Sequence, residues 1–153
     1  MLSYRIGVML VLAAPAAFVM AQDQDEATKA ELKKLEGSWK VVSMELAGEK
    51  VPLEGKKFIF IFKGDKVTSS FDGKALPSAT FKINGKADPK HLDTIVPEGP
   101  QMGKTDMALY ILDGDTLKIA SYKGDTSIGK RPPTFPKDGD KDMDIFVLKR
   151  EKV

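Results

Sequence analysis

The sequence predicts an all-β protein, an eight-stranded antiparallel up-and-down barrel that follows a short N-terminal helix. Eight short segments of β type recur between residues 38 and 150, most of them with apolar side chains at alternate positions. Tight-turn pairs such as Gly64-Asp65 and Asn84-Gly85 connect successive segments, and such turns favour hairpins over long crossovers. The expected strands are residues 38–47, 57–63, 66–72, 79–84, 91–96, 106–112, 116–123 and 143–150.

The first 21 residues have the pattern of a secretory signal peptide. Arg5 precedes a nearly unbroken apolar run over residues 6–21, which ends at Ala21 before an acidic, polar stretch. A membrane anchor is the alternative, but 16 residues interrupted by Pro15 are fewer than the roughly 20 that a spanning helix needs. We therefore expect cleavage after Ala21, export to the periplasm or the extracellular space, and no membrane span in the processed chain.

The processed chain, residues 22–153, has a length suited to a single domain. Without Arg5 it carries 23 basic and 22 acidic residues with both signs interspersed, so no nucleic-acid-binding surface is expected. The sequence contains no cysteine, which excludes both a lipid-modified cysteine and disulfide bonds. The stability of the domain must therefore come from its core.

A short helix is expected before the first strand. Residues 28–31 have the spacing of a capping box, with Thr28 as the N-cap, and Gly37 can end the helix. Leu32 and Leu35 lie three residues apart, which gives the helix one apolar side. A helix this short is not stable alone, so we expect it to cover one end of the barrel as a lid or plug.

Alternation along the strands divides the side chains between two faces. The rows assigned to the interior are Phe58, Phe60 and Phe62; Phe81 and Ile83; Leu109 and Ile111; Leu117 and Ile119; and Ile145 and Val147. Apolar side chains at the opposite positions, namely Ile59, Ile61, Tyr110, Phe146 and Leu148, are expected under the helix, under the proline-rich loop of residues 124–141, or at the surface. An eight-stranded barrel is either filled by side chains or holds one small ligand, and the sequence leaves both open.

Several motifs resemble those of a known family. They are residues 35–43 (Leu-Glu-Gly-Ser-Trp-Lys-Val-Val-Ser), residues 89–93, residues 109–118, Arg131-Pro132, Phe135 and residues 147–150 (Val-Leu-Lys-Arg). Gly37-Ser38-Trp39 and Arg150 are similar to the Gly-x-Trp and terminal-arginine signature of lipocalins and the wider calycin group. In this order, over nearly the whole processed chain, the motifs resemble an uncharacterised lipocalin-like domain family abundant in planctomycete bacteria. The resemblance implies a lipocalin-like β-barrel and leaves its activity open.

The chain departs from that pattern at two places. Ala120 stands where the family often has cysteine, and Pro133-Thr134 stands where it more often has Thr-Glu. Neither difference affects the expected fold.

Few residues are suited to catalysis. No cysteine nucleophile, P-loop, dinucleotide fingerprint or Gly-x-Ser-x-Gly motif is present. His91 is the single histidine, and Asp93 shares its strand face, but no partner serine can be identified. We expect His91 to be a locally hydrogen-bonded structural residue, and we expect neither enzymatic activity nor a cofactor.

Two loop features are candidate binding motifs. Asp138, Asp140, Asp142 and Asp144 alternate around Gly139, but Met143 and Lys149 occupy the positions where a calcium-binding EF-hand loop needs glycine and glutamate. A solvated acidic entry to the last strand is expected instead, with no metal site. Residues 131–133 could present a polyproline-type recognition segment, although a rigid spacer is the more common role of such a run.

Two functions from different classes remain. The first is binding of a small hydrophobic ligand inside the barrel, with Phe58, Phe60, Phe62, Phe81 and Tyr110 as its lining. The alternative is a packed structural or protein-interaction module of the cell envelope. In either case Trp39 and Arg150 are expected to meet where the first and last strands close the barrel, with Lys149 as the competing partner.

Overall fold

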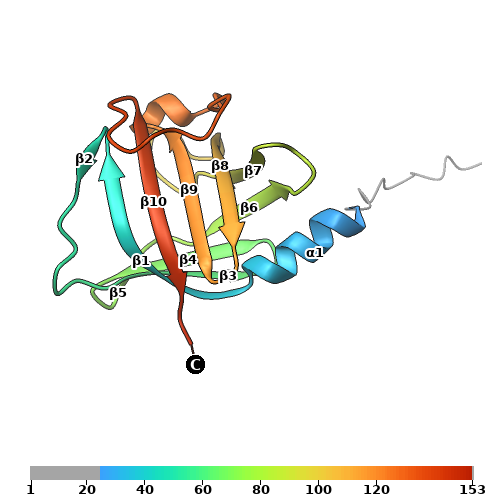
Figure 1. Ribbon diagram of the computed structural model, residues 1–153, viewed down its shortest axis with the longest axis horizontal. Helices are drawn as coiled ribbons and strands as arrows, with labels where there is room; N and C mark the ends of the chain where they lie inside the picture. The colour runs from blue at the N-terminus through green and yellow to red at the C-terminus, as the bar shows by residue number, and fades with distance from the viewer. Residues whose placement is uncertain (1–24, 153) are drawn as a thin grey trace, which may run out of the picture.

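A computed structural model describes residues 25–152 of the chain (Figure 1). The expected signal peptide and its cleavage site lie outside these residues. Within the described part, no helix is both long and apolar enough to cross a membrane.

Eight antiparallel strands form a closed barrel. Their order is β1-β3-β4-β6-β7-β8-β9-β10, and β10 pairs with β1 to complete the ring. The predicted up-and-down lipocalin-like barrel is therefore confirmed. The strands are β1 (Gly37–Leu46), β3 (Phe58–Lys63), β4 (Lys66–Phe71), β6 (Ala79–Asn84), β7 (Lys90–Ile95), β8 (Thr105–Asp113), β9 (Thr116–Tyr122) and β10 (Met143–Arg150).

Two further strands of two residues each were not expected. They are β2 (Glu49–Lys50), which pairs with β1, and β5 (Lys74–Ala75), which pairs with β4. The turn before β5 holds Asp72 and Gly73, both in the left-handed region with φ of 48° and 79°. The next strand expected along the chain was the one at residue 79, but this turn closes a shorter hairpin at the edge of the barrel.

The helix α1 (Glu26–Leu35) begins three residues earlier than expected. Asp25 is the N-cap, and its Oδ1 accepts a hydrogen bond from the backbone N–H of Thr28 at 2.9 Å. The prediction of Thr28 as N-cap was therefore wrong, because an aspartate three residues upstream supplies the same capping bond one turn sooner. The helix lies across one end of the barrel, as expected, with Leu35 fully buried (Figure 1).

The register corrects part of the assignment of faces. Residues directly opposite each other on neighbouring strands share a face, and Tyr110 lies opposite Ile119, while Leu148 lies opposite both Leu117 and Val41. Tyr110, Leu148 and likewise Phe146 thus point into the barrel. The rows Leu109 with Ile111 and Ile145 with Val147, which were assigned to the interior, point outward.

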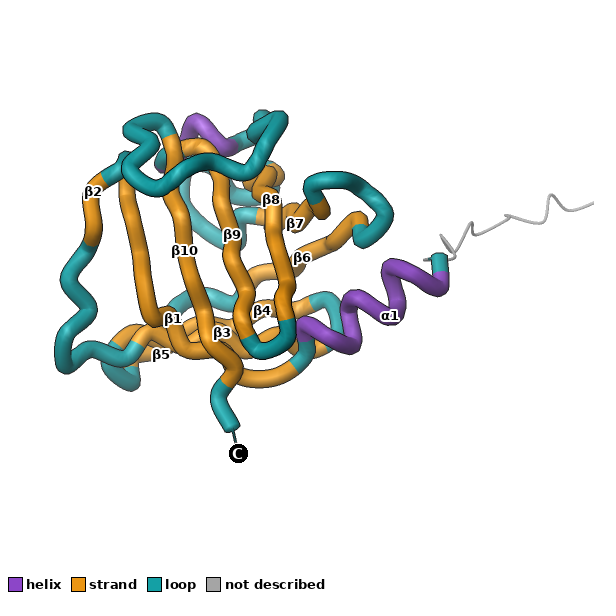
Figure 2. The backbone as a smooth tube through the Cα atoms, viewed as in Figure 1, coloured by secondary structure: helices purple, strands orange, loops and turns teal. Residues whose placement is uncertain are grey.

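The long connection between β9 and β10 explains why the outward positions are so apolar. It contains the short 3-10 helix η1 (Gly124–Ser127) and passes over the outer face of the barrel (Figure 2). Phe135 packs on a second buried cluster formed by Ala120, Met143 and Ile145. Both faces of this part of the sheet are therefore buried, and alternation alone could not tell them apart.

Candidate functional site

A cavity of about 290 Å³ lies inside the barrel. It occupies the end away from α1, which we call the open end, where β6 and β8 begin and β7 and β9 end. The exposed loop residues Pro77 and Pro97 belong to its lining, so the cavity reaches the surface between their loops. The whole lining is Phe60, Phe62, Val67, Ser69, Pro77, Ala79, Leu92, Thr94, Pro97, Asp106, Ala108, Ile119, Ser121 and Phe146.

Aromatic and aliphatic side chains form one side of the cavity. The rings of Phe60 and Phe62 are stacked with centroids 6.5 Å apart, and the ring of Phe146 meets Phe60 edge-on at 6.4 Å. Offset and edge-to-face arrangements at these distances are the stable geometries of aromatic pairs. A rigid apolar wall results, built from side chains of β3 and β10.

Two of the five residues expected to bind a ligand line this cavity, namely Phe60 and Phe62. Phe81 is buried behind Phe62, with ring centroids 5.2 Å apart, and it supports the wall without lining the cavity. Phe58 packs against Phe60 and Phe71. These two residues thus belong to the packing around the cavity.

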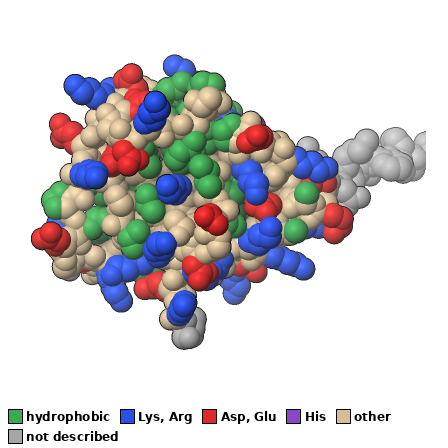
Figure 3. Space-filling model, in the orientation of Figure 1, with side chains coloured by type: hydrophobic (Ala, Val, Ile, Leu, Met, Phe, Trp, Pro, Cys, Tyr) green, Lys and Arg blue, Asp and Glu red, His purple; other side chains and the backbone are tan. Residues whose placement is uncertain are grey.

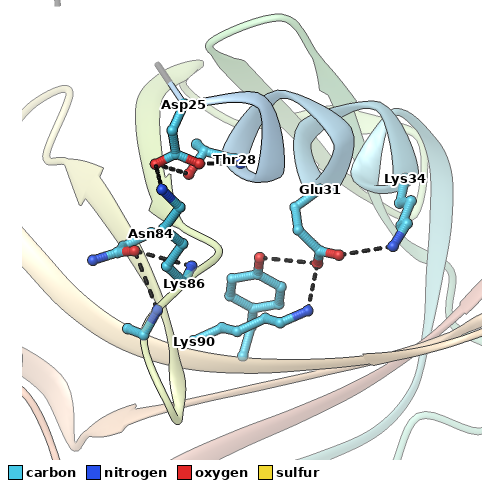
Figure 4. A network of polar contacts seen from close by, with 9 residues as sticks. Asp25, Thr28, Glu31, Lys34, Asn84, Lys86 and Lys90 are labelled. Atoms are coloured by element: carbon cyan, nitrogen blue, oxygen red, sulfur yellow. Dashed lines mark hydrogen bonds and ion pairs between the residues drawn. The ribbon is translucent and has the colours of Figure 1, made fainter. Parts of the chain in front are cut away.

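Tyr110 lies at the opposite, closed end of the barrel, next to Glu31, whose contacts with Lys34 and Lys90 are shown in Figure 4. Its hydroxyl lies 3.4 Å from Glu31 Oε2 of α1, and Lys90 Nζ lies 2.7 Å from the same oxygen. Lys34 Nζ contacts the other oxygen of Glu31 at 2.9 Å. Every partner of this carboxylate comes from the helix or the strands beneath it, so the network attaches α1 to the barrel.

The pKa values in this network follow from its geometry. Burial raises the pKa of Tyr110, and the negative charge of Glu31 adds to the rise, so the phenol keeps its proton. Burial alone would also raise the pKa of Glu31, but the hydrogen bonds and charges of Lys90 and Lys34 outweigh it and lower that pKa. Glu31 is therefore an ionised structural group and is unsuited to act as a proton donor.

Trp39 and Arg150 lie opposite each other in the register of β1 and β10. The guanidinium carbon of Arg150 lies 4.2 Å from the centre of the indole ring, and Arg150 Nη1 donates to Glu36 O at 2.7 Å. The indole N–H of Trp39 donates to Leu35 O at 2.8 Å. A Cβ on Gly37, whose φ is +119°, would lie 3.2 Å from Arg150 Nη1, which explains the glycine of the Gly-x-Trp triplet.

His91 and Asp93 both lie on the outer face of β7. The Asp93 carboxylate pairs with the Arg131 guanidinium, which also donates to Ala108 O at 2.6 Å. Burial and the positive charge of Arg131 lower the pKa of His91, while the Asp93 charge partly opposes them. Because Asp93 is paired with Arg131, this geometry offers no catalytic His-Asp pair. Arg131 also attaches the long loop to the barrel, so residues 131–133 are not presented as a free recognition segment.

The acidic run before β10 is used locally. Asp144 Oδ1 accepts from Ala47 N at 2.9 Å and its Oδ2 from Gly124 N at 3.1 Å, while Asp140 Oδ1 accepts from Asp142 N at 3.0 Å. Among residues 25–152, no cluster of three or more metal-ligating side chains is present. The carboxylates therefore organise the ends of the long loop.

Asp106 is a polar residue of the cavity that the sequence reasoning did not single out. Its Oδ1 atom is buried and has no hydrogen-bond partner among the described residues. Burial raises the pKa of Asp106, with smaller contributions in the same direction from the charges of Asp144 and Asp93, whereas the Ser127 hydroxyl lowers it. This carboxyl group is the single charged group in the lining of the cavity.

Small inward-facing residues explain why the cavity exists. Ser69, Ala79, Ala108 and Ser121 all contribute to its lining, each on a different strand. The sequence left open whether the interior is filled, because large residues dominate the assumed inner rows. With the correct parity on β8, Ala108 would have been recognised as an inward position, and it is the signal that could have found the cavity.

Comparisons with family models, curated proteins and solved structures found no match to this chain. The proposals below therefore depend on the geometry of the barrel.

Proposed function

We propose that the protein is an exported lipocalin-like binding protein that holds one small, largely apolar molecule in the open end of its barrel. The observation that carries this proposal is the cavity with its wall of phenylalanines. A volume of about 290 Å³ is at the lower limit of small-molecule pockets, which are roughly 300 to 1,000 Å³. The size therefore favours a compact ligand over a long-chain lipid.

Two features support binding over catalysis. The lining contains no histidine, cysteine or lysine, the residue types most often used as base or nucleophile. Charged side chains of both signs are interspersed over the face seen in Figure 3, which offers no basic surface for nucleic acid. We propose no enzymatic activity and no cofactor.

A cavity-filling variant tests the proposed function. Ala108→Leu places a larger side chain into the cavity, while Ala75→Leu makes the same change at the exposed strand β5, outside it. We expect a hydrophobic fluorescent probe to bind the parent and the Ala75→Leu variant, and to lose most of its binding in Ala108→Leu. Equal probe binding by all three proteins, or none by the parent, would contradict binding in the barrel.

Native mass spectrometry of the protein purified from its own host adds a direct search for a retained molecule. Sequencing of the exported form tests the proposed export, because cleavage after Ala21 leaves Gln22 as the first residue, within a residue or two. An intact residue 1–21 segment on the mature protein would contradict export by cleavage.

The alternative is a protein-interaction module, favoured by exposed apolar side chains outside the barrel. Ile61 is 46% exposed on the outer face of β3, and Leu76 is exposed nearby. For this alternative we expect no probe binding, together with a self-association or partner affinity that Ile61→Lys removes.

A further inference from the structure

The interior cavity has a polar side as well as an apolar one. Ser69, Thr94, Ser121 and Asp106 all contribute to the lining, from β4, β7, β9 and β8. The three hydroxyl groups can donate or accept hydrogen bonds, but an ionised carboxylate can only accept them. Asp106 therefore sets the chemical character of any group that binds on this side.

The Asp106 carboxylate is not neutralised by the protein. Hydrogen bonding by the Ser127 hydroxyl, which also lies 2.8 Å from Gly124 O, lowers the pKa of Asp106, but no cationic side chain belongs to the cavity lining. The nearest arginine in the long loop, Arg131, is committed to Asp93 and to Ala108 O on the outer face. Asp106 Oδ1 is buried without a hydrogen-bond partner among the described residues, which is costly for a charged group, so a positively charged donor in the open end would bind there favourably.

Two further acidic groups act on Asp106 with the same sign of charge. They are Asp144 on β10 and Asp93, which lies on the outer face of β7 and is paired with Arg131. The local field therefore attracts cations and repels anions. A carboxylate-bearing molecule such as a fatty acid would bring a like charge into a poorly solvated site.

We propose that the ligand of the barrel is a small amphipathic amine, whose ammonium group donates to Asp106 and whose apolar body lies against Phe60, Phe62 and Phe146. This inference rests on the proposed binding function and names the chemical class of its ligand. An alkylammonium group keeps its proton at neutral pH, since the reference pKa of such a group is about 10.4. The volume of about 290 Å³ equals roughly ten water molecules at about 30 Å³ each, which suits an aryl or short alkyl body.

Three probes with the same phenylethyl body separate the head group from the cavity. They are 2-phenylethylamine, the neutral 2-phenylethanol and the anionic 3-phenylpropanoate, each titrated by calorimetry into the parent protein at neutral pH. We expect the amine to bind about tenfold or more tightly than the alcohol, as a charge-assisted hydrogen bond implies, and the carboxylate to bind more weakly than both.

The variant Asp106→Asn removes the charge and keeps the shape of the side chain. We expect the amine to lose about tenfold or more in affinity, so that it binds like the alcohol, whose own affinity stays within about twofold of the parent value. Asp113→Asn is the matched control, because it makes the same change on the same strand β8 at the exposed, opposite end. It should leave all three affinities unchanged.

A pH series on the parent protein provides a measurement that needs no variant. Because burial raises the pKa of Asp106 above its ordinary value of 3.8, amine affinity should fall as the solution is acidified and the carboxylate takes up a proton, while the affinity of the alcohol stays constant. Equal binding of amine and alcohol by the parent, or an amine affinity insensitive to both Asp106→Asn and pH, would overturn the amine assignment and leave the binding function intact. Failure of all three probes to bind the parent would overturn both.

Discussion

Replacing Arg150 by methionine tests whether one side chain holds the barrel seam and the helix together. The guanidinium stacks on Trp39 of β1 and donates to Glu36 O and to Lys34 O at the end of α1. Its Nε also lies 3.2 Å from Asp115 Oδ1 in the turn between β8 and β9. Methionine keeps an apolar stem over the indole but removes all of these polar contacts.

The expected cost follows from the exposure of these contacts. Stacking of a guanidinium on an aromatic ring contributes about 0.5 to 2 kcal/mol, depending on how far the pair is desolvated. A hydrogen bond from a charged donor contributes about 1.5 to 3 kcal/mol, and the lower end applies because the Arg150 side chain is 28% exposed. Asp115 adds little, since its side chain is 59% exposed. We expect Arg150→Met to lower the free energy of unfolding by about 2 to 4 kcal/mol.

Urea denaturation followed by circular dichroism measures this change for Arg150→Met, Trp39→Phe and the double variant. We expect a coupling free energy above about 0.5 kcal/mol between the two positions, because they are in direct contact. Lys149→Met is the control, since Lys149 is the neighbouring exposed cation on the opposite face of β10, and it should cost less than about 0.5 kcal/mol. Additive effects of the two substitutions, or equal costs at positions 149 and 150, would refute the role assigned to Arg150.

Three further perturbations test the core, the helix network and the helix contact. Phe81→Ala, at a position 2% exposed, should lower the free energy of unfolding by about 3 to 5 kcal/mol, and Phe60→Ala, beside the cavity, should lower it by less. Chemical denaturation of both variants ranks the two costs, and the reverse order would contradict the cavity. Because the folded-state pKa of Glu31 is lowered, its contribution to the free energy of unfolding is present above its ordinary pKa of 4.5 and is lost as pH falls through the folded value. Glu31→Gln should therefore reduce the pH dependence of the free energy of unfolding across this acidic range. An unchanged pH profile would contradict the network. In Gly85→Ala the new Cβ would lie 2.9 Å from Glu31 Cγ, so the Glu31 side chain or the helix that carries it must shift, at a cost of about 1 to 3 kcal/mol. Thermal unfolding measures this cost, and an unaltered midpoint would show that α1 does not pack there.

The strands could be predicted from the sequence because two independent patterns agree on them. Alternation marks residues such as Phe58, Phe60 and Phe62 as one face of a strand, and glycine-containing pairs such as Asn84-Gly85 mark where the chain reverses. Each barrel strand differs from its expected bounds by one residue or less at either end. Closure followed from the same reasoning, since a meander of eight strands removes its edges by pairing the last strand with the first.

The choice between faces could not be made in the same way on β8 and β10. Leu109 and Tyr110 are each about 1% exposed, although they point to opposite sides of the sheet. Tyr110 is covered by the barrel interior, and Leu109 lies on the side that the long loop covers. Only the tertiary structure distinguishes these two environments. The same error affected the candidate site, because the wrong parity on β8 placed Ala108 and Asp106 among the outward positions.

The two ends of the barrel differ in how their buried polar groups are satisfied, and this difference bears on function. At the closed end, Glu31 has three donors, and the Trp39 indole N–H has an acceptor in Leu35 O. At the open end, Gln101 Oε1 and Asp106 Oδ1 are both buried without partners among the described residues, and both belong to the hairpin of β7 and β8. Unpaired buried acceptors lower the stability of a fold, so a donor supplied by another molecule at the open end would offset that cost. The closed end thus stabilises the barrel, and under the proposed function a ligand at the open end should raise its stability further, with the logarithm of ligand concentration over the dissociation constant once the site is saturated.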